Sequence, residues 1–212
     1  MYKAFLFDMD GTLVDTFDVI YESFNKALDE NKKRLLTKRE FKEHLFGKAV
    51  DSTLPALVGV SSQDEIKKIL KDFEKHWIKD LHKIKIFKDV FITLHQLKEG
   101  GAKLGVVSTS PRGVIEETMR TVDLYQFFDV IIGEEDANFK KPHHEPVSNA
   151  LKVLTVPSKE TVFVGDTIYD MMAGKDAGCY TVLLLNGHNE EVLDSFEPDK
   201  VIGSVKELLE LT

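Results

Sequence analysis

Several residues that could bind a phosphate group or a metal ion come directly after apolar runs of the sequence. In chain order they are Asp8, Asp10, Ser108, Thr109, Lys141, Asp166 and Asp170. Taken one at a time, these short motifs are common in proteins. Their order carries the information, because each follows an apolar run or the loop after one, and the acidic pairs come first and last. The carboxyl ends of parallel strands meet at one edge of a sheet, where ligands bind, so we expect these residues to converge there.

Four converging carboxylates are costly unless a divalent cation or a lysine offsets their charge. Oxygen ligands without histidine or cysteine favour Mg²⁺, which often bridges carboxylates and a substrate phosphate. Lys141 supplies a positive charge, and Ser108, Thr109 and the loop amides supply hydrogen-bond donors to phosphate oxygens. The sequence therefore predicts a magnesium-dependent site for phosphoryl transfer on a small phosphorylated molecule.

Asp8 and Asp10 are two residues apart, so both side chains can face the same side of an extended segment. One carboxylate can attack phosphorus while the other handles the proton of the leaving group. Gly11 allows the sharp turn that would point backbone groups at the phosphate.

Apolar runs and helical patterns alternate over most of the chain. The runs expected to be buried strands are 2–7, 103–107, 128–132, 161–164 and 180–185, and helical periods centre on 90–97, 114–122 and 147–154. This alternation predicts an α/β fold, a Rossmann-like, doubly wound parallel sheet with helices on both faces.

Residues 15–85 break the alternation, since they show helical periodicity without a convincing strand. Capping-box patterns at Thr37–Glu40 and Ser62–Glu65 support helix starts there. We expect about four helices in this segment, including a buried Trp77. The predicted organisation is a core domain of residues 1–14 and 86–212 with an inserted helical cap of residues 15–85.

Composition excludes several classes of protein. The chain has 212 residues, of which 42% are hydrophobic and 30% charged, and its net charge of −8 argues against nucleic acid or an anionic membrane as partner. No apolar run is long enough for a membrane span or a signal peptide, so we expect a cytoplasmic protein. Its single cysteine, Cys179, is expected to be buried rather than disulfide-bonded. A monomer or a homodimer fits equally well.

The motifs together resemble the haloacid dehalogenase-like hydrolase superfamily, and most closely its phosphoglycolate phosphatase-like branch. Residues 7–15 are similar to the first family motif, Ser108 to the second, Lys141 to the third, and Gly165, Asp166 and Asp170 to the fourth. The helical insertion lies between the first and second motifs, as in family members with a cap of the first type.

The resemblance implies a role for each residue. Asp8 would be the nucleophile and Asp10 the general acid and base. Asp8, the carbonyl of Asp10 and Asp166 would hold Mg²⁺, with Asp170 assisting directly or through water. Ser108 and Lys141 would bind the transferring phosphoryl group, and Lys141 would also restrain Asp8. The cap would exclude water and select the leaving group.

Three alternatives stay open at this point. A pyrophosphatase and a sugar-phosphate mutase belong to the same superfamily, and a non-catalytic binding protein could use the same scaffold. Against a mutase, Val50 stands where mutases of the family carry an arginine, and Lys48 substitutes for it only in part. After the third motif, His144 replaces a proline that is usual in the family, and it follows another histidine, His143. Two histidines beside a site could bind a metal ion or a phosphate group, but we interpret them as part of a surface loop that leads into a helix.

Overall fold

The computed structural model describes residues 2–46, 50–60, 62–186 and 189–212. The chain divides into two compact units, one formed by Met1–Asp15 and Lys85–Thr212 and the other by Thr16–Ile84. Lys48 of the mutase comparison lies outside the described residues. In the described part of the chain, no helix is both long and apolar enough to cross a membrane.

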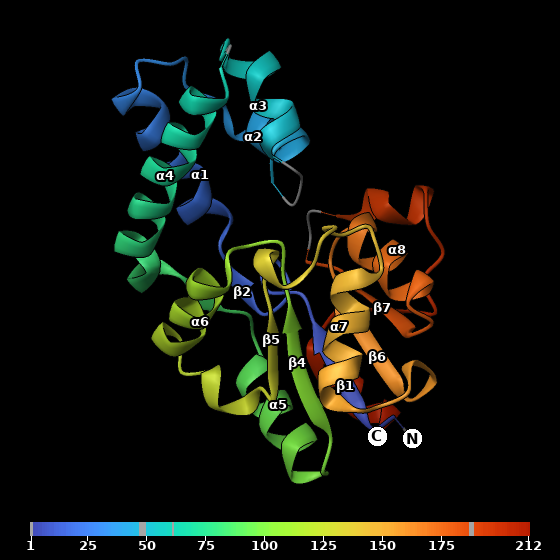
Figure 1. The fold of residues 1–212 in the computed structure, drawn as a ribbon. Helices are drawn as coiled ribbons and strands as arrows, with labels where there is room; N and C mark the ends of the chain where they lie inside the picture. Colours follow the sequence, from blue (N-terminus) through green and yellow to red (C-terminus); the bar gives the residue numbers. More distant parts are fainter. Residues whose placement is uncertain (1, 47–49, 61, 187–188) are drawn as a thin grey trace. The chain divides into compact units, whose positions relative to one another are not determined.

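The larger unit is built on a six-stranded sheet with the order β5-β4-β1-β6-β7-β8, in which every neighbouring pair is parallel (Figure 1). The strands are β1 (Ala4–Phe7), β4 (Lys103–Val107), β5 (Val130–Ile132), β6 (Thr161–Gly165), β7 (Tyr180–Leu184) and β8 (Lys200–Ile202). β1 lies at the centre, and the chain builds outward from it first through β4 and later through β6. The strand order therefore reverses at β1, which is where open α/β sheets bind ligands.

Helices cover both faces of this sheet, as the apolar runs predict for strands buried on two sides. They are α5 (Val90–Glu99), α6 (Arg112–Thr121), α7 (Glu145–Leu154), α8 (Ile168–Asp176) and the 3₁₀ helix η6 (Val205–Leu211). On one face, Ala4 and Leu6 of β1 pack with Val147 and Ala150 of α7. The alternate residues Phe5 and Phe7 are also fully buried, on the opposite face. The predicted α/β architecture is confirmed.

The smaller unit contains α1 (Phe17–Glu30), α2 (Lys38–His44), α3 (Val50–Val58) and α4 (Gln63–Asp80), with the short 3₁₀ helix η1 (Leu81–Lys83). α1 and α4 pack against each other. The smaller unit has a hydrophobic core of its own, which includes Phe24, Phe41 and Ile69. The predicted capping box at Thr37 is present, with Glu40 as its partner. Trp77 is buried, as expected.

The chain leaves and re-enters the larger unit through a short antiparallel pair of strands. β2 (Val14–Asp15) pairs with β3 (Lys85–Ile86), so that Val14 faces Ile86 and Asp15 faces Lys85. Both strands belong to the larger unit, and residues 16–84 are thus an insertion whose two ends are neighbours.

Candidate active site

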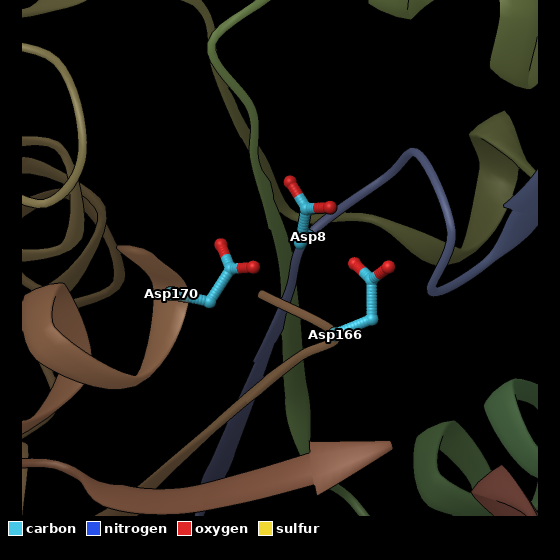
Figure 2. Close-up of side chains that lie close together, drawn as sticks. All are labelled: Asp8, Asp166 and Asp170. Atoms are coloured by element: carbon cyan, nitrogen blue, oxygen red, sulfur yellow. The ribbon is translucent and has the colours of Figure 1, made fainter. Parts of the chain in front are cut away.

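The ends of the three central strands carry the candidate residues. Asp8 follows β1, Ser108 follows β4 and Asp166 follows β6, while Asp170 lies in the first turn of α8. Because these strands are parallel and adjacent, their carboxyl ends meet at one edge of the sheet. The side chains of Asp8, Asp166 and Asp170 point toward one another there (Figure 2), with one carboxylate oxygen of each within 4.8 Å of the others.

Lys141 joins this cluster from the loop before α7. Its Nζ atom donates to Oδ1 of Asp8 and to Oδ1 of Asp170, both at 2.6 Å, and to the carbonyl of Val107 at 3.0 Å. The lysine side chain is buried, so these three acceptors replace the water it would otherwise bind. Lys141 therefore fixes one oxygen of Asp8 and ties it to Asp170.

Asp170 is held on both carboxylate oxygens. Oδ1 accepts from Lys141, while Oδ2 accepts from the backbone N–H of Thr167 at 3.0 Å and from its hydroxyl at 2.5 Å. Thr167 in turn caps α8, since its hydroxyl accepts from the N–H of Asp170. This reciprocal cap orients Asp170 toward Lys141.

The protonation of the cluster reflects its burial. Loss of solvation raises the pKa of Asp8 to about 7, although the charge of Lys141 opposes this and the charges of Asp170 and Asp10 add to it. Burial also raises the pKa of Asp166 well above its usual range, with further contributions from Asp8 and Asp170. Burial alone would lower the pKa of Lys141, but Asp170 and Asp8 more than offset it, so the lysine stays protonated.

The donor set fits a hard divalent cation. In the part of the chain that the structure describes, three buried carboxylates face one lysine. When all three are ionised, as a metal ligand set requires, two of the negative charges lack a charged partner. Among the described residues, no hydrogen bond reaches Oδ2 of Asp8, whereas both oxygens of Asp170 have partners. Oxygen ligands from Asp8 and Asp166 are the kind that Mg²⁺ prefers, and a charge of +2 would balance the cluster.

The other predicted residues lie around this cluster. The carboxyl of Asp10 is outside the group of mutually close carboxylates, and its Oδ2 accepts from the hydroxyl of Ser110 at 3.4 Å. Ser108 is buried, and its Oγ accepts from the N–H of Ser110 at 3.2 Å. Thr109 is half-buried next to it. The loop after β4 therefore contacts the loop after β1 through Ser110, which belongs to the same polar cluster of the sequence as Ser108 and Thr109 but was given no role there.

Two asparagines that contact Asp166 were not predicted from the sequence. Asn186 follows β7, and its Nδ2 donates to Oδ2 of Asp166 at 3.0 Å and to the carbonyl of Gly11 at 3.2 Å. Asn189 is buried and donates to the carbonyl of Asp166 at 2.7 Å. The strand-end rule that identified the other residues applies equally to β7, so inspection of the residues after the fifth apolar run would have found Asn186.

His143 and His144 form an exposed aromatic group with Phe139. The ring centroids of Phe139 and His143 are 4.7 Å apart, and those of His143 and His144 are 4.5 Å apart. Nδ1 of His143 accepts from the N–H of Glu145, and Nδ1 of His144 lies 3.1 Å from the hydroxyl of Ser148. These contacts order the entry into α7.

The comparisons with known proteins agree with this geometry. Residues 5–184 match the family model described as haloacid dehalogenase-like hydrolase. The chain belongs to the haloacid dehalogenase-like hydrolases. It is 32% identical over 207 residues to pyrophosphatase PpaX of Bacillus mycoides, covering 96% of this chain and 94% of the relative. The PpaX protein of Anoxybacillus flavithermus is also 32% identical, over 99% of this chain and 96% of its own length.

Solved structures share the fold over the whole chain. A protein described as a predicted phosphoglycolate phosphatase from Haemophilus somnus superposes with a TM-score of 0.88 at 24% identity, covering 99% of this chain and 97% of that one. CbbY from Rhodobacter sphaeroides, solved in complex with phosphate, has a TM-score of 0.86 at 22% identity, with 98% and 96% covered. These structures show that the chain has the same fold as proteins of this kind. The family model together with the relatives at 32% identity makes this chain a hydrolase of the phosphatase type.

Proposed function

We propose that this chain is a Mg²⁺-dependent phosphatase that hydrolyses a small phosphomonoester, similar to phosphoglycolate, through an aspartyl-phosphate on Asp8. The observation that carries the proposal is the buried cluster of Asp8, Asp166 and Asp170, in which Lys141 is the one lysine found among the described residues. Such a cluster is poorly balanced by itself, and it suits a cation together with the phosphate group of a substrate. Asp8, the carbonyl of Asp10 and Asp166 would hold the cation, which when bound neutralises charge on the phosphoryl oxygens.

The proposed reaction has two steps. In the first, a carboxylate oxygen of Asp8 attacks phosphorus, the bond from phosphorus to the leaving oxygen breaks, and Asp10 gives that oxygen a proton. In the second, Asp10 takes a proton from water, the water oxygen attacks phosphorus, and the bond to Asp8 breaks to release inorganic phosphate. Lys141 keeps Asp8 in position, and with Ser108 and Thr109 it would bind the phosphoryl oxygens.

The substitution Asp8→Asn tests this mechanism. Asparagine has nearly the same shape but no nucleophilic charge, so hydrolysis of p-nitrophenyl phosphate should fall by at least about a thousandfold while the fold persists. Asp18→Asn, a change of the same kind at an exposed position of α1, should keep full activity. Full activity of Asp8→Asn would rule out the aspartyl-phosphate. Asp10→Asn should slow both the formation and the hydrolysis of the intermediate.

Hydrolysis of pyrophosphate is a second candidate, and the names of the relatives at 32% identity favour it. A panel of phosphoglycolate, pyrophosphate, nucleotides and hexose phosphates, assayed with and without Mg²⁺, separates the two. Release of inorganic phosphate distinguishes either hydrolase from a mutase. Ligand binding without turnover of any member of the panel would point to a binding protein instead.

A further inference from the structure

We infer that Asn186 and Thr12 are positioning residues that hold Asp166 in the orientation needed to bind Mg²⁺, an inference that rests on the proposed function. Each of the two residues holds one oxygen of this carboxylate. The hydroxyl of Thr12 donates to Oδ1 at 3.2 Å, and the amide of Asn186 donates to Oδ2 at 3.0 Å. Asp166 and Thr12 are buried, so the two neutral donors replace water at the carboxylate.

The two contacts come from different parts of the chain. Thr12 belongs to the turn after β1, and Asn186 follows β7. Nδ2 of Asn186 also donates to the carbonyl of Gly11 at 3.2 Å, so one amide links Asp166 to the turn that contains Asp10. Asn186 therefore sets the spacing between the two segments that carry the proposed ligands.

Asn189 fixes Asn186 in turn. Its Oδ1 accepts from the backbone N–H of Asn186 at 3.1 Å, and its Nδ2 donates to the carbonyls of Asp166 at 2.7 Å and Leu184 at 2.8 Å. Both donors of this buried amide are thus satisfied by the ends of β6 and β7. Asn189 thus links Asn186 to the ends of β6 and β7, and these contacts keep the side chain of Asn186 at Asp166.

Neutral donors suit this place for an electrostatic reason. A neutral amide or hydroxyl stabilises the ionised carboxylate of Asp166. Unlike a second lysine, it carries no positive charge that would compete with the cation for that carboxylate. Each oxygen of Asp166 keeps a second lone pair for a cation, because Thr12 and Asn186 engage one apiece. Partners of this kind around metal ligands typically change metal affinity by about 10- to 100-fold when they are removed.

The test measures Mg²⁺ binding directly, by calorimetric titration of the substrate-free protein. Asn186→Leu has a similar volume but no donor, and it should weaken Mg²⁺ binding by about tenfold. Thr12→Val removes the hydroxyl on the other oxygen and should have an effect of the same size. As a matched control, Asn149→Leu removes an amide on α7 that donates to the carbonyl of Asp136 at 2.9 Å, and it should leave Mg²⁺ affinity unchanged.

A kinetic readout separates positioning from a merely structural role. Saturating Mg²⁺ should restore kcat of Asn186→Leu to within about threefold of the unsubstituted protein, because the reacting groups are intact and only the metal affinity has changed. If Asn186→Leu shows no cooperative unfolding transition, the variant is not properly folded, and Asn186→Ala is used in its place in the same titration. Folded variants whose Mg²⁺ affinity stays within about twofold of the unsubstituted protein would overturn the inference.

The outcome is independent of the substrate. Mg²⁺ binding that weakens as expected in a protein without phosphatase activity would contradict the proposed function and leave the positioning role standing. Unchanged Mg²⁺ affinity in active variants would contradict the positioning role alone. An unsubstituted protein that binds no Mg²⁺ would overturn both.

Discussion

At the scale of single residues, Gly11 is where the chain turns away from β1, with a φ angle of +82°. A side chain at this position would run into the carboxylate of Asp166. Glycine therefore serves two needs at once, a left-handed backbone conformation and the close approach of a buried acidic group.

Replacement of Gly11 by alanine should accordingly harm both the backbone and the site. We expect Gly11→Ala to lower the free energy of unfolding by about 1–2 kcal/mol for the left-handed conformation, and to weaken Mg²⁺ binding because Asp166 must move. Thermal unfolding and calorimetric titration measure the two effects. Gly113→Ala, where a Cβ atom meets open space, is the control, and an equal result for both variants would contradict the expectation.

Sequence patterns identified the charged residues of the site better than the neutral ones that hold them. Asp8, Asp166, Asp170 and Lys141 converge as expected from their places after strands. Asn186 also comes directly after an apolar run, but it contacts Asp166 and Gly11 from another part of the chain, and no local pattern specifies such contacts. The catalytic and metal-binding roles assigned to the charged residues stay predictions, since they rest on the family resemblance and the geometry.

At the scale of elements, a salt bridge links the end of α4 to α1. Asp80 is buried, and its carboxylate accepts from Lys26 of α1 at 2.6 Å and pairs with Lys83 of η1 at 3.0 Å. The hydrogen bond from Lys26 lowers the pKa of Asp80 to about 2; burial opposes it, and Lys83 adds to it.

This lowered pKa predicts a pH-dependent contribution to stability. The folded state binds the proton of Asp80 more weakly than the unfolded state, so the stabilisation is present above the unfolded pKa of about 4 and is lost as pH falls toward about 2. Asp80→Asn should therefore lower stability at neutral pH, by about 1 kcal/mol because the lysine ends are half-exposed.

The measurement is the difference in Tm between Asp80→Asn and the unsubstituted protein, followed from pH 7 downward. The difference should shrink as the pH approaches about 2. Asp29→Asn, at an exposed position of α1 in the same unit, should show no comparable difference. A difference in Tm that does not change with pH would contradict this coupling between the protonation of Asp80 and the stability of the fold.

The elements were predicted well where burial dominates and poorly where strands are short. The five long apolar runs became strands of the sheet, because a strand buried on both faces must be apolar throughout. β8 was not predicted, because it is a short strand and its central residue, Val201, is exposed. Ser204 and Glu207 form a capping box at the start of the last helix, yet that helix is 3₁₀ rather than α-helical, because a cap fixes where a helix begins and not its period.

At the scale of the whole molecule, the uncompensated charge of the site predicts that Mg²⁺ stabilises the fold. A ligand present at 100 times its dissociation constant adds about 2.7 kcal/mol, which corresponds to roughly 5–10 °C in Tm for a unit of this size. EDTA should reverse the shift, and NaCl at the same ionic strength should not reproduce it. Equal Tm values with Mg²⁺ and with EDTA would contradict a cation site among these carboxylates.

The pairing of β2 with β3 has a consequence for how this protein can be re-engineered. Asp15 and Lys85 are cross-strand partners, so a two-residue Asn-Gly turn is long enough to join them directly. Residues 16–84 are thus a replaceable cassette with its own hydrophobic core, and grafting a different cassette between these two anchor points leaves the connectivity of the parallel sheet intact.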